Sequence, residues 1–118
     1  MKIFILEDAP ERMNWFLETF SDCDIDYTDD VHKGYEYLSS NSYDLIFLDR
    51  DLGHPKYTGE DLAWEMMEEK LSPHATVVVH TVNTRGQRVI PKYLKRYNKK
   101  VYQIPFPQLS KLKREDFV

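Results

Sequence analysis

Two short apolar runs of this chain, residues 3–6 and 45–48, each lead directly into acidic side chains. The acids that follow them are Glu7, Asp8, Asp49 and Asp51. Carboxylate oxygens are the ligands that Mg²⁺ and Mn²⁺ prefer, and carboxylates held close together repel each other unless a cation or a proton compensates them. The sequence therefore predicts that these four side chains form a divalent metal site. The alternative interpretation is that Glu7 and Asp8 cap a helix and that Asp51 is a solvated loop residue.

A third apolar run, residues 77–79, leads into His80, Thr81 and Asn83. Histidine titrates near neutral pH, so His80 is a candidate general acid and base, or a metal ligand. Thr81 and Asn83 carry neutral donors that can hold phosphate oxygens, and Gly86 allows the backbone to approach a ligand closely. The alternative for His80 is a hydrogen-bonded residue of the core.

Arg50 lies between two of the predicted metal-binding aspartates. Its planar guanidinium can clamp a phosphate through two parallel hydrogen bonds, a geometry that lysine cannot match. The alternative is a surface arginine that neutralises the neighbouring aspartates. Arg85 and Arg88 are further candidates for contact with phosphate. Thr58, at the start of a predicted helix, is a candidate for contact with the ligand.

The elements that must position these residues alternate along the chain. Apolar runs predict strands at 3–6, 25–27, 45–48, 75–79 and 101–104, and helical spacing predicts helices at 10–20, 31–40, from 58 or 59 to 72, at 87–97 and within 108–118. This alternation predicts an α/β fold, a doubly wound five-stranded parallel sheet with helices on both faces. Ligands of such sheets bind at the carboxyl ends of the strands. We therefore expect the acidic residues, His80 and Asn83 to converge on one crevice.

Local signals place several of the predicted boundaries. Pro10 suits the first turn of the first helix, and Asp30 suits the cap of the second. Pro91 is compatible with the helix at 87–97 only near its first turn, because proline lacks the backbone N–H that a helix interior needs. The prolines of the segment 105–107 end the last strand, so the final helix is expected after them.

Size and composition indicate a single soluble domain, residues 1–118. The chain is 42% hydrophobic and 31% charged, which are ordinary values for a globular protein. It contains no apolar stretch long enough to cross a membrane and no signal-peptide pattern at its amino terminus. The single Cys23 cannot form a disulfide within the chain. We therefore expect a reducing, cytoplasmic environment and no membrane partner.

Charge is distributed unevenly along the chain. Residues 1–70 hold 18 Asp and Glu against 6 Lys and Arg, whereas residues 71–118 hold 2 Asp and Glu against 10 Lys and Arg. The acidic part contains the predicted metal ligands. The basic part can attract a phosphate-bearing ligand or a nucleic acid. The alternative is a solvated helix face that balances the acidic part.

The order of these features resembles the receiver domain of response regulators over nearly the whole chain. In receivers an acidic pair and an aspartate after the third strand hold a divalent ion, usually magnesium, and that aspartate accepts a phosphoryl group. Glu7, Asp8 and Asp49 occupy those places here, and Thr81 lies near the receiver hydroxyl of the fourth strand. Receivers usually carry a lysine before a proline at the end of the fifth strand. This chain has no lysine in the corresponding segment, 103–106.

The departures from common receivers resemble one family derived from them, the cyclic-phosphate processing receiver domains. The motifs that carry this resemblance are Asp49-Arg50-Asp51-Leu52-Gly53, Thr58-Gly59, His80-Thr81-Val82-Asn83 with Gly86, and Pro105-Phe106. They appear in the family's order and at strand ends. The resemblance implies a receiver-like, flavodoxin-like fold and a site for a phosphate ligand. One position differs, since Arg50 replaces the family's histidine between the two aspartates.

The leading hypothesis is a metal-dependent phosphoesterase that binds and hydrolyses a cyclic phosphate on a nucleotide or an RNA end. Bound Mg²⁺ or Mn²⁺ would polarise a phosphoryl oxygen and lower the pKa of a bound water. Asp49 and Asp51 would hold the metal at the reacting phosphate, and His80 would move the proton. Thr81, Asn83, Arg50 and Gly86 would then position the phosphate.

Two alternatives belong to other functional classes. One is a stand-alone response-regulator receiver that a signalling kinase phosphorylates on Asp49; the missing lysine argues against it. The other is a non-catalytic module that captures a phosphorylated ligand or a partner protein. Turnover would favour the enzyme, modification of Asp49 by a small phosphodonor the receiver, and binding without metal the capture module.

Overall fold

The computed structural model describes residues 1–117, and in this range five parallel strands form one sheet in the order β2-β1-β3-β4-β5. The strands are β1 (Lys2–Leu6), β2 (Asp24–Thr28), β3 (Leu45–Leu48), β4 (Thr76–Val79) and β5 (Val101–Gln103). All five predicted strands are present, and the predicted doubly wound parallel sheet is confirmed.

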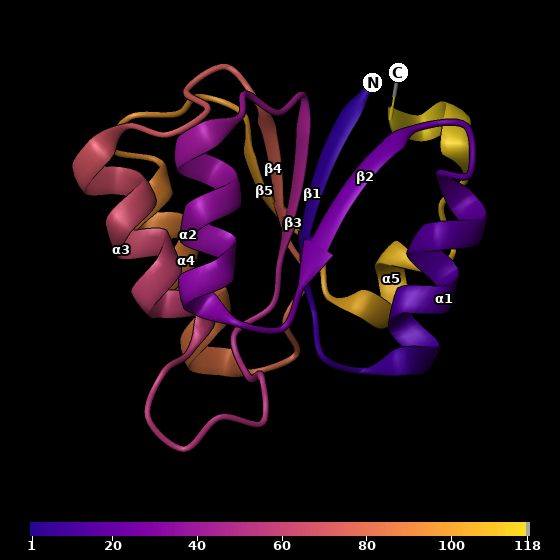
Figure 1. Cartoon of the computed structure of the whole chain (residues 1–118). Helices are drawn as coiled ribbons and strands as arrows, with labels where there is room; N and C mark the ends of the chain where they lie inside the picture. Colours follow the sequence, from indigo (N-terminus) through magenta and orange to yellow (C-terminus); the bar gives the residue numbers. More distant parts are fainter. Residues whose placement is uncertain (118) are drawn as a thin grey trace.

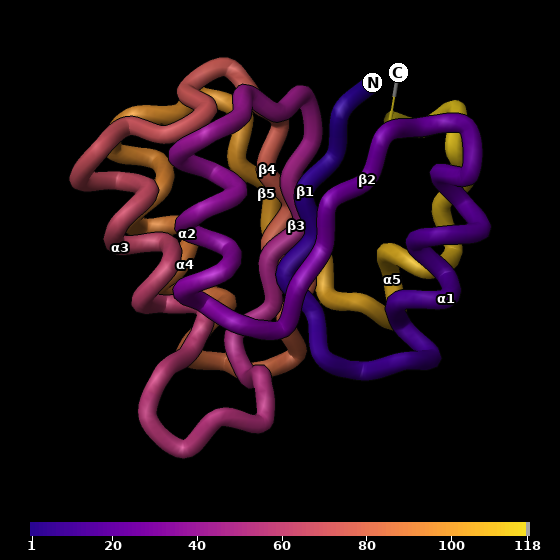
Figure 2. Tube along the Cα trace, in the orientation of Figure 1, coloured from indigo at the N-terminus to yellow at the C-terminus, as the bar shows by residue number. Residues whose placement is uncertain are grey.

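Helices cover both faces of the sheet. They are α1 (Pro10–Thr19), α2 (Val31–Ser40), α3 (Gly59–Glu69), α4 (Thr84–Leu94) and α5 (Phe106–Leu109), followed by the 3-10 helix η1 (Arg114–Phe117). Figure 1 shows α2, α3 and α4 on one face and α1 and α5 on the other. In the same orientation, Figure 2 shows the long loop between β3 and α3 extending beyond the carboxyl ends of the strands.

The two faces of the sheet carry separate hydrophobic cores. In β1, Phe4 and Leu6 pack under α2, α3 and α4, whereas Ile3 and Ile5 pack under α1 and α5. This alternation is the side-chain period of a strand, and both faces are buried, which explains why the central strands read as uniformly apolar runs. The edge strands differ, since Tyr27 of β2 and Tyr102 of β5 are half exposed.

Helix starts agree with the predicted signals at three places. Pro10 is the first residue of α1, and the side chain of Asp30 accepts a hydrogen bond from the backbone N–H of His32 at the start of α2. Thr58 caps α3 and forms a capping box with Asp61. α3 ends at Glu69, earlier than the predicted residue 72.

The prediction for the fourth helix was wrong at both ends. The helix begins at Thr84 rather than at residue 87, because the side chain of Asn83 accepts a hydrogen bond from the N–H of Gly86 and caps the helix. It ends at Leu94 rather than at residue 97. Pro91 therefore lies well inside the helix and not near its first turn.

The carboxyl-terminal part also differs from its prediction. β5 ends at Gln103, one residue early, and α5 begins at Phe106, before the predicted range 108–118. Prolines fit the first turn of a helix, so Pro105 and Pro107 begin α5 instead of delaying it. Val118 lies outside the described residues. Among residues 1–117 no helix combines the length and the apolar character needed to cross a bilayer.

Candidate functional site at the carboxyl ends of the strands

Three polar residues follow the three central strands at the same level of the sheet. Hydrogen bonding between strands continues one residue past each strand: the N–H of Asp49 donates to the carbonyl of Leu6 (3.1 Å), and the N–H of His80 donates to the carbonyl of Leu48 (3.0 Å). Glu7, which follows Leu6, is bound in the same way to β2. The parallel register therefore places Glu7, Asp49 and His80 side by side.

Glu7 and His80 form a buried pair. Nε2 of His80 lies 2.8 Å from Oε1 of Glu7, and both side chains are fully covered. Oε2 of Glu7 accepts hydrogen bonds from the backbone N–H groups of Asp8 and Ala9, each at 3.0 Å. Burial alone raises the pKa of Glu7, but the hydrogen bond and charge of His80, the bond from Ala9 and the charge of Arg12 outweigh it and lower the pKa to about 2. Glu7 is therefore ionised, and both of its oxygens are engaged.

The imidazole of His80 lies in an aromatic environment beneath the site. Its ring packs edge-on against Phe16, Phe47 and Phe106, with ring centroids 5.3, 6.5 and 6.3 Å away. Within residues 1–117 its Nδ1 has no hydrogen-bond partner. A neutral ring is best satisfied with its proton on Nε2, facing the carboxylate of Glu7. His80 thus contacts the crevice through Glu7, and its predicted role as the proton carrier stays a prediction.

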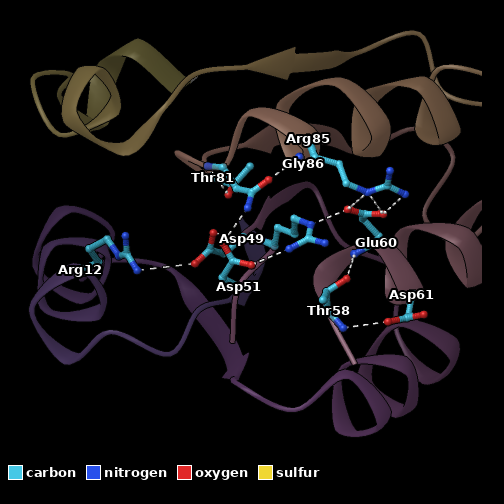
Figure 3. A network of polar contacts seen from close by, with 11 residues as sticks. Arg12, Asp49, Asp51, Thr58, Glu60, Asp61, Thr81, Arg85 and Gly86 are labelled. Atoms are coloured by element: carbon cyan, nitrogen blue, oxygen red, sulfur yellow. Dashed lines mark hydrogen bonds and ion pairs between the residues drawn. The ribbon is translucent and has the colours of Figure 1, made fainter. Parts of the chain in front are cut away.

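Arg12 from α1 joins the carboxylates of β1 and β3. Its Nη2 lies 3.8 Å from Oδ1 of Asp8 and 3.6 Å from Oδ2 of Asp49, and its Nε lies 3.1 Å from Oε1 of Glu7. Figure 3 shows the contact between Arg12 and Asp49. Sequence reasoning missed Arg12. The available signal was its position four residues after Asp8, a spacing that places two side chains on the same face of a helix.

Burial raises the pKa of all three carboxyl groups, but only in Asp8 and Asp49 does it outweigh the nearby donors and charges. It raises the pKa of Asp49, and the charge of Glu7 adds to this, although His80 and Arg12 act in the opposite direction. It also raises the pKa of Asp8, where Glu7 again contributes. Asp49 accepts one close hydrogen bond, from the backbone N–H of Arg50 at 2.8 Å, whereas Glu7 accepts three. The two aspartates are therefore less stabilised as anions than Glu7 and have more to gain from a nearby cation.

Asp51 belongs to a second group of contacts at the mouth of the site. Its Oδ1 accepts a hydrogen bond from Nη1 of Arg50 (2.7 Å), and its Oδ2 accepts one from Nδ2 of Asn83 (3.1 Å). Arg50 also donates through Nε to Glu60, which binds Arg85 in turn (Figure 3). Glu60 was missed from the sequence. Arg50, predicted to clamp phosphate, is held by two carboxylates in this arrangement.

The remaining predicted phosphate-binding residues support one another. Oγ1 of Thr81 accepts a hydrogen bond from the N–H of Asn83 (3.1 Å), and Oδ1 of Asn83 accepts one from the N–H of Gly86 (3.0 Å). Thr81 is buried. A Cβ on Gly86 would lie 2.9 Å from side-chain atoms of Arg50 and Thr81. Gly86 therefore allows α4 to approach the site closely, whereas contact of its backbone with a ligand stays a prediction.

Comparison with known families agrees with this geometry. The model of the family described as the cyclic-phosphate processing receiver domain matches residues 4–96. The chain belongs to this family. The match includes every strand-end motif before β5 and confirms the resemblance inferred from those motifs. The comparison with curated proteins gave no match.

Solved structures similar to this cyclic-phosphate processing receiver domain are receivers of response regulators. Response regulator TrrA of Thermotoga maritima, in complex with Mg²⁺ and BeF, is 19% identical with a TM-score of 0.69, covering 99% of this chain and 98% of its own. The Mn²⁺-bound response regulator Rcp1 is 19% identical (TM-score 0.66; 87% and 79% covered). A CheY-like receiver domain of Methylobacillus flagellatus is 16% identical (0.65; 92% of each chain). At these identities the likeness shows the fold.

The acidic cluster of the family's site fits a hard divalent cation. Glu7, Asp49 and His80 each offer a ligand atom, and these atoms lie within 4.8 Å of one another. Glu7 and His80 are engaged with each other, however, whereas Asp8 and Asp49 both lie within 4 Å of one guanidinium nitrogen. We therefore regard Asp8 and Asp49 as the carboxylates best placed for a metal, with Glu7 behind them. Of the predicted ligands, Asp8 and Asp51 are outside the group of three described residues whose ligand atoms lie within 4.8 Å of one another; Asp8 pairs with Arg12 and Asp51 with Arg50.

Proposed function

We propose that this domain binds Mg²⁺ or Mn²⁺ together with a phosphate group and hydrolyses a cyclic phosphate. The observation that carries the proposal is the meeting of two kinds of group at one sheet edge. Asp8 and Asp49 suit a cation, and Arg12, Arg50 and Asn83 suit an anion. Membership of the cyclic-phosphate processing family supports the choice of substrate class. Two similar receivers have been solved with Mg²⁺ and with Mn²⁺, which supports the choice of metal.

In this proposal Asp8 and Asp49 would hold the metal, and Asp51 would position Arg50 and Asn83 at the mouth of the site. A bound divalent ion would supply Lewis-acid polarisation of a phosphoryl oxygen and a more acidic bound water. Hydrolysis adds the oxygen of one water to phosphorus and breaks one of the two ring P–O bonds. The freed ribose oxygen takes up a proton, and the phosphate remains as a monoester on the other of the two ribose oxygens that it bridged.

His80 acts in this proposal mainly through Glu7. The imidazole donates to a carboxylate that is ionised and buried, so it fixes the orientation of Glu7 beneath the metal site. Proton exchange with a substrate would pass by way of Glu7, because His80 is completely covered. This makes His80 a positioning residue.

Phosphate would be held on the side of β4 and α4. Arg50 can turn from Asp51 or Glu60 to the phosphate, because its guanidinium has five N–H donors. Asn83 donates to Asp51 and can exchange that bond for a phosphate oxygen. Thr81 would assist through its hydroxyl, which accepts from Asn83 and still has a proton to donate.

A nucleotide is the substrate class that the surroundings favour. A cavity of about 400 Å³ opens beside the acidic pair, lined by residues that include Asp8, Tyr27 and Thr28. Tyr27 is 50% exposed and offers an aromatic face on which a base can stack. The basic part of the chain after residue 70 would favour a larger polyanion such as an RNA end.

Phosphorus NMR tests the proposal directly. The purified protein with Mg²⁺ or Mn²⁺ is incubated with a panel of 2′,3′- and 3′,5′-cyclic nucleotides, and ring opening is followed over time. Asp49→Asn and Asp8→Asn keep side-chain size and remove the charge of one proposed ligand. Opening of one ring type by the wild-type protein, lost in both variants, would support the proposal.

A negative result separates the remaining functions. Metal binding without ring opening would contradict hydrolysis and favour capture of a phosphorylated ligand or the phosphoacceptor function. Asp49 lies directly after β3, the place of the phosphoacceptor in receivers, so labelling with acetyl phosphate distinguishes these two. Covalent phosphate on wild-type protein but not on Asp49→Asn would establish the phosphoacceptor function.

A further inference from the structure

The segment after β5 lacks the lysine of common receivers: Ile104 stands before Pro105 in its place, and the aromatic Phe106 follows. Phe106 follows Pro105, and its N–H donates to the carbonyl of His80 at 2.9 Å, which ties it to the end of β4. The segment 103–106 contains no Lys or Arg, so it brings no positive charge to Asp49. A phosphate bound at Asp49 would need its positive charge from another element.

Arg12 of α1 supplies a positive charge at this position. Its guanidinium carbon lies 5.9 Å from the centre of the Phe106 ring, and its Nη2 lies 3.6 Å from Asp49. A cation at this distance over an aromatic ring is favourably placed. Arg12 thus approaches Asp49 beside the ring of Phe106, two residues after the place of the missing lysine.

The contacts of Arg12 leave it able to bind an anion. Its two contacts to Asp8 and Asp49, at 3.8 and 3.6 Å, are ion pairs longer than hydrogen bonds. Its Nε lies 3.1 Å from Glu7, but among the described residues it has no aligned hydrogen-bond partner. The side chain is 27% exposed. Donors that are charged, weakly engaged and accessible are what a phosphate oxygen requires.

We infer that Arg12 binds the phosphate of the ligand and supplies from α1 a positive charge that the segment 103–106 does not provide. The inference rests on the proposed function, since it concerns the same ligand. When a divalent ion occupies Asp8 and Asp49, the carboxylates no longer hold the guanidinium. Arg12 is then free to pair with phosphate, opposite Arg50 on the other side of the site.

Replacing Arg12 should have two opposite effects, because its guanidinium pairs with the two aspartates and, in this inference, with phosphate. Without the guanidinium the site loses a donor to phosphate, so phosphate binding weakens. It also loses a cation that competes for Asp8 and Asp49, so metal binds as tightly as before or more tightly. A residue that only supports the fold would weaken both, because metal and phosphate depend on the same strand ends.

The test compares Arg12→Met and Arg12→Lys with wild type. Arg12→Met keeps the length of the side chain and removes its charge, whereas Arg12→Lys keeps the charge and loses the fork. Arg114→Met is the matched control. Arg114 has the same 27% exposure, pairs with Asp22 and lies 5.9 Å from the ring of Phe20. It belongs to η1, close to the chain termini and away from the site (Figure 1).

Two binding measurements decide the matter. Mn²⁺ affinity is measured by water-proton relaxation, and orthophosphate affinity by equilibrium dialysis at saturating Mg²⁺; circular dichroism checks the fold of each variant. We expect Arg12→Met to bind orthophosphate at least about tenfold more weakly, the cost of one charged hydrogen bond. Its Mn²⁺ affinity should be equal or higher. Arg12→Lys should lie between Arg12→Met and wild type, and Arg114→Met should match wild type.

Three outcomes would overturn the inference. They are an orthophosphate affinity of Arg12→Met within twofold of wild type, a joint loss of Mn²⁺ and orthophosphate binding, and a wild-type protein that binds no orthophosphate with metal present. Failure of the proposed hydrolysis looks different. In that case wild type binds orthophosphate through Arg12 but opens no cyclic phosphate.

Discussion

Gly59 and Asp49 are in direct backbone contact. A Cβ built on Gly59 would lie 1.8 Å from the carbonyl oxygen of Asp49, a separation that real Cβ atoms do not show. The N–H of Gly59 also donates to the carbonyl of Arg50 at 2.8 Å. The first turn of α3 is therefore held against the segment that carries the central aspartate. In the Thr58-Gly59 motif, Thr58 caps α3 and Gly59 allows the helix to pack directly against the backbone of Asp49.

Replacing Gly59 with alanine is expected to displace Asp49. The obstacle is backbone on both sides, so the clash cannot be relieved by a change of rotamer. We expect Gly59→Ala to lower the free energy of unfolding by about 1–3 kcal/mol, as other overpacked sites do. We also expect weaker Mn²⁺ binding. Urea unfolding and water-proton relaxation measure the two effects.

Gly34→Ala is the matched control for Gly59→Ala. A Cβ on Gly34 would lie 3.0 Å from Leu62 and 3.2 Å from Phe4, both side-chain contacts in the core and away from the site. Alanine also favours the helix by about 1 kcal/mol relative to glycine. Gly34→Ala should therefore cost less stability and leave Mn²⁺ binding unchanged. Equal loss of Mn²⁺ binding in both variants would contradict a specific link between Gly59 and Asp49.

The ring nitrogen of His80 that faces Glu7, Nε2, is expected to carry a proton. Glu7 accepts there at 2.8 Å, and Nδ1 has no partner among residues 1–117. Long-range proton–nitrogen NMR distinguishes the two tautomers through the separate shifts of the ring nitrogens. Glu7→Gln keeps the size of the side chain but offers a weaker acceptor. We expect it to shift the Nε2 proton signal of His80, and an unchanged signal would contradict the pairing.

The central strands could be predicted well because burial leaves few choices for them. Residues 45–48 are apolar and became β3 at the predicted limits, since a strand covered on both faces tolerates no polar side chain. The start of α4 was placed late. Asn83 was interpreted as a ligand-binding residue, although asparagine is also a common cap at the start of a helix. Its side chain caps α4 by accepting a hydrogen bond from the N–H of Gly86. Both interpretations of Asn83 fit one side chain, and the sequence does not choose between them.

The contacts of the site could be predicted only where strand ends determine them. Parallel register brings Glu7, Asp49 and His80 to one edge, and this followed from the order of the apolar runs. Arg12 and Glu60 were missed because they reach the site from helices. Which neighbour such a side chain contacts depends on helix packing angles and rotamers, which leave no local pattern in the sequence.

Acid should weaken the link between α3 and the site through Glu60. Burial raises the pKa of Glu60, but the hydrogen bonds from Arg50 and Arg85 outweigh it, and the net shift is downward. A lowered carboxyl pKa stabilises the fold at neutral pH, and this contribution is lost as the carboxylate is protonated.

The measurement compares melting temperatures between about pH 5 and pH 3, a range that begins above the usual glutamate pKa and ends below it. We expect wild type to lose stability more steeply than Glu60→Gln over this range. Glu65→Gln, an exposed position on the same helix, should follow wild type. Parallel curves for wild type and Glu60→Gln would show that the two arginines do not stabilise the ionised form.

Removing the charge of Asp49 is expected to stabilise the metal-free protein and to abolish its response to metal. Burial raises the pKa of Asp49, so its ionised form costs folding free energy at neutral pH, and Asn avoids that cost at nearly the same size. With chelator present, Asp49→Asn should therefore melt at a higher temperature than wild type.

Mn²⁺ should reverse this order, since it binds the folded state through a carboxylate that only wild type has. At one hundred times the dissociation constant, such binding stabilises by about 2.7 kcal/mol. Glu18→Gln, which removes one exposed charge from α1, should respond to Mn²⁺ as wild type does. An equal rise in melting temperature for Asp49→Asn would place the ion elsewhere, because a ligand can stabilise the fold only through the groups that hold it.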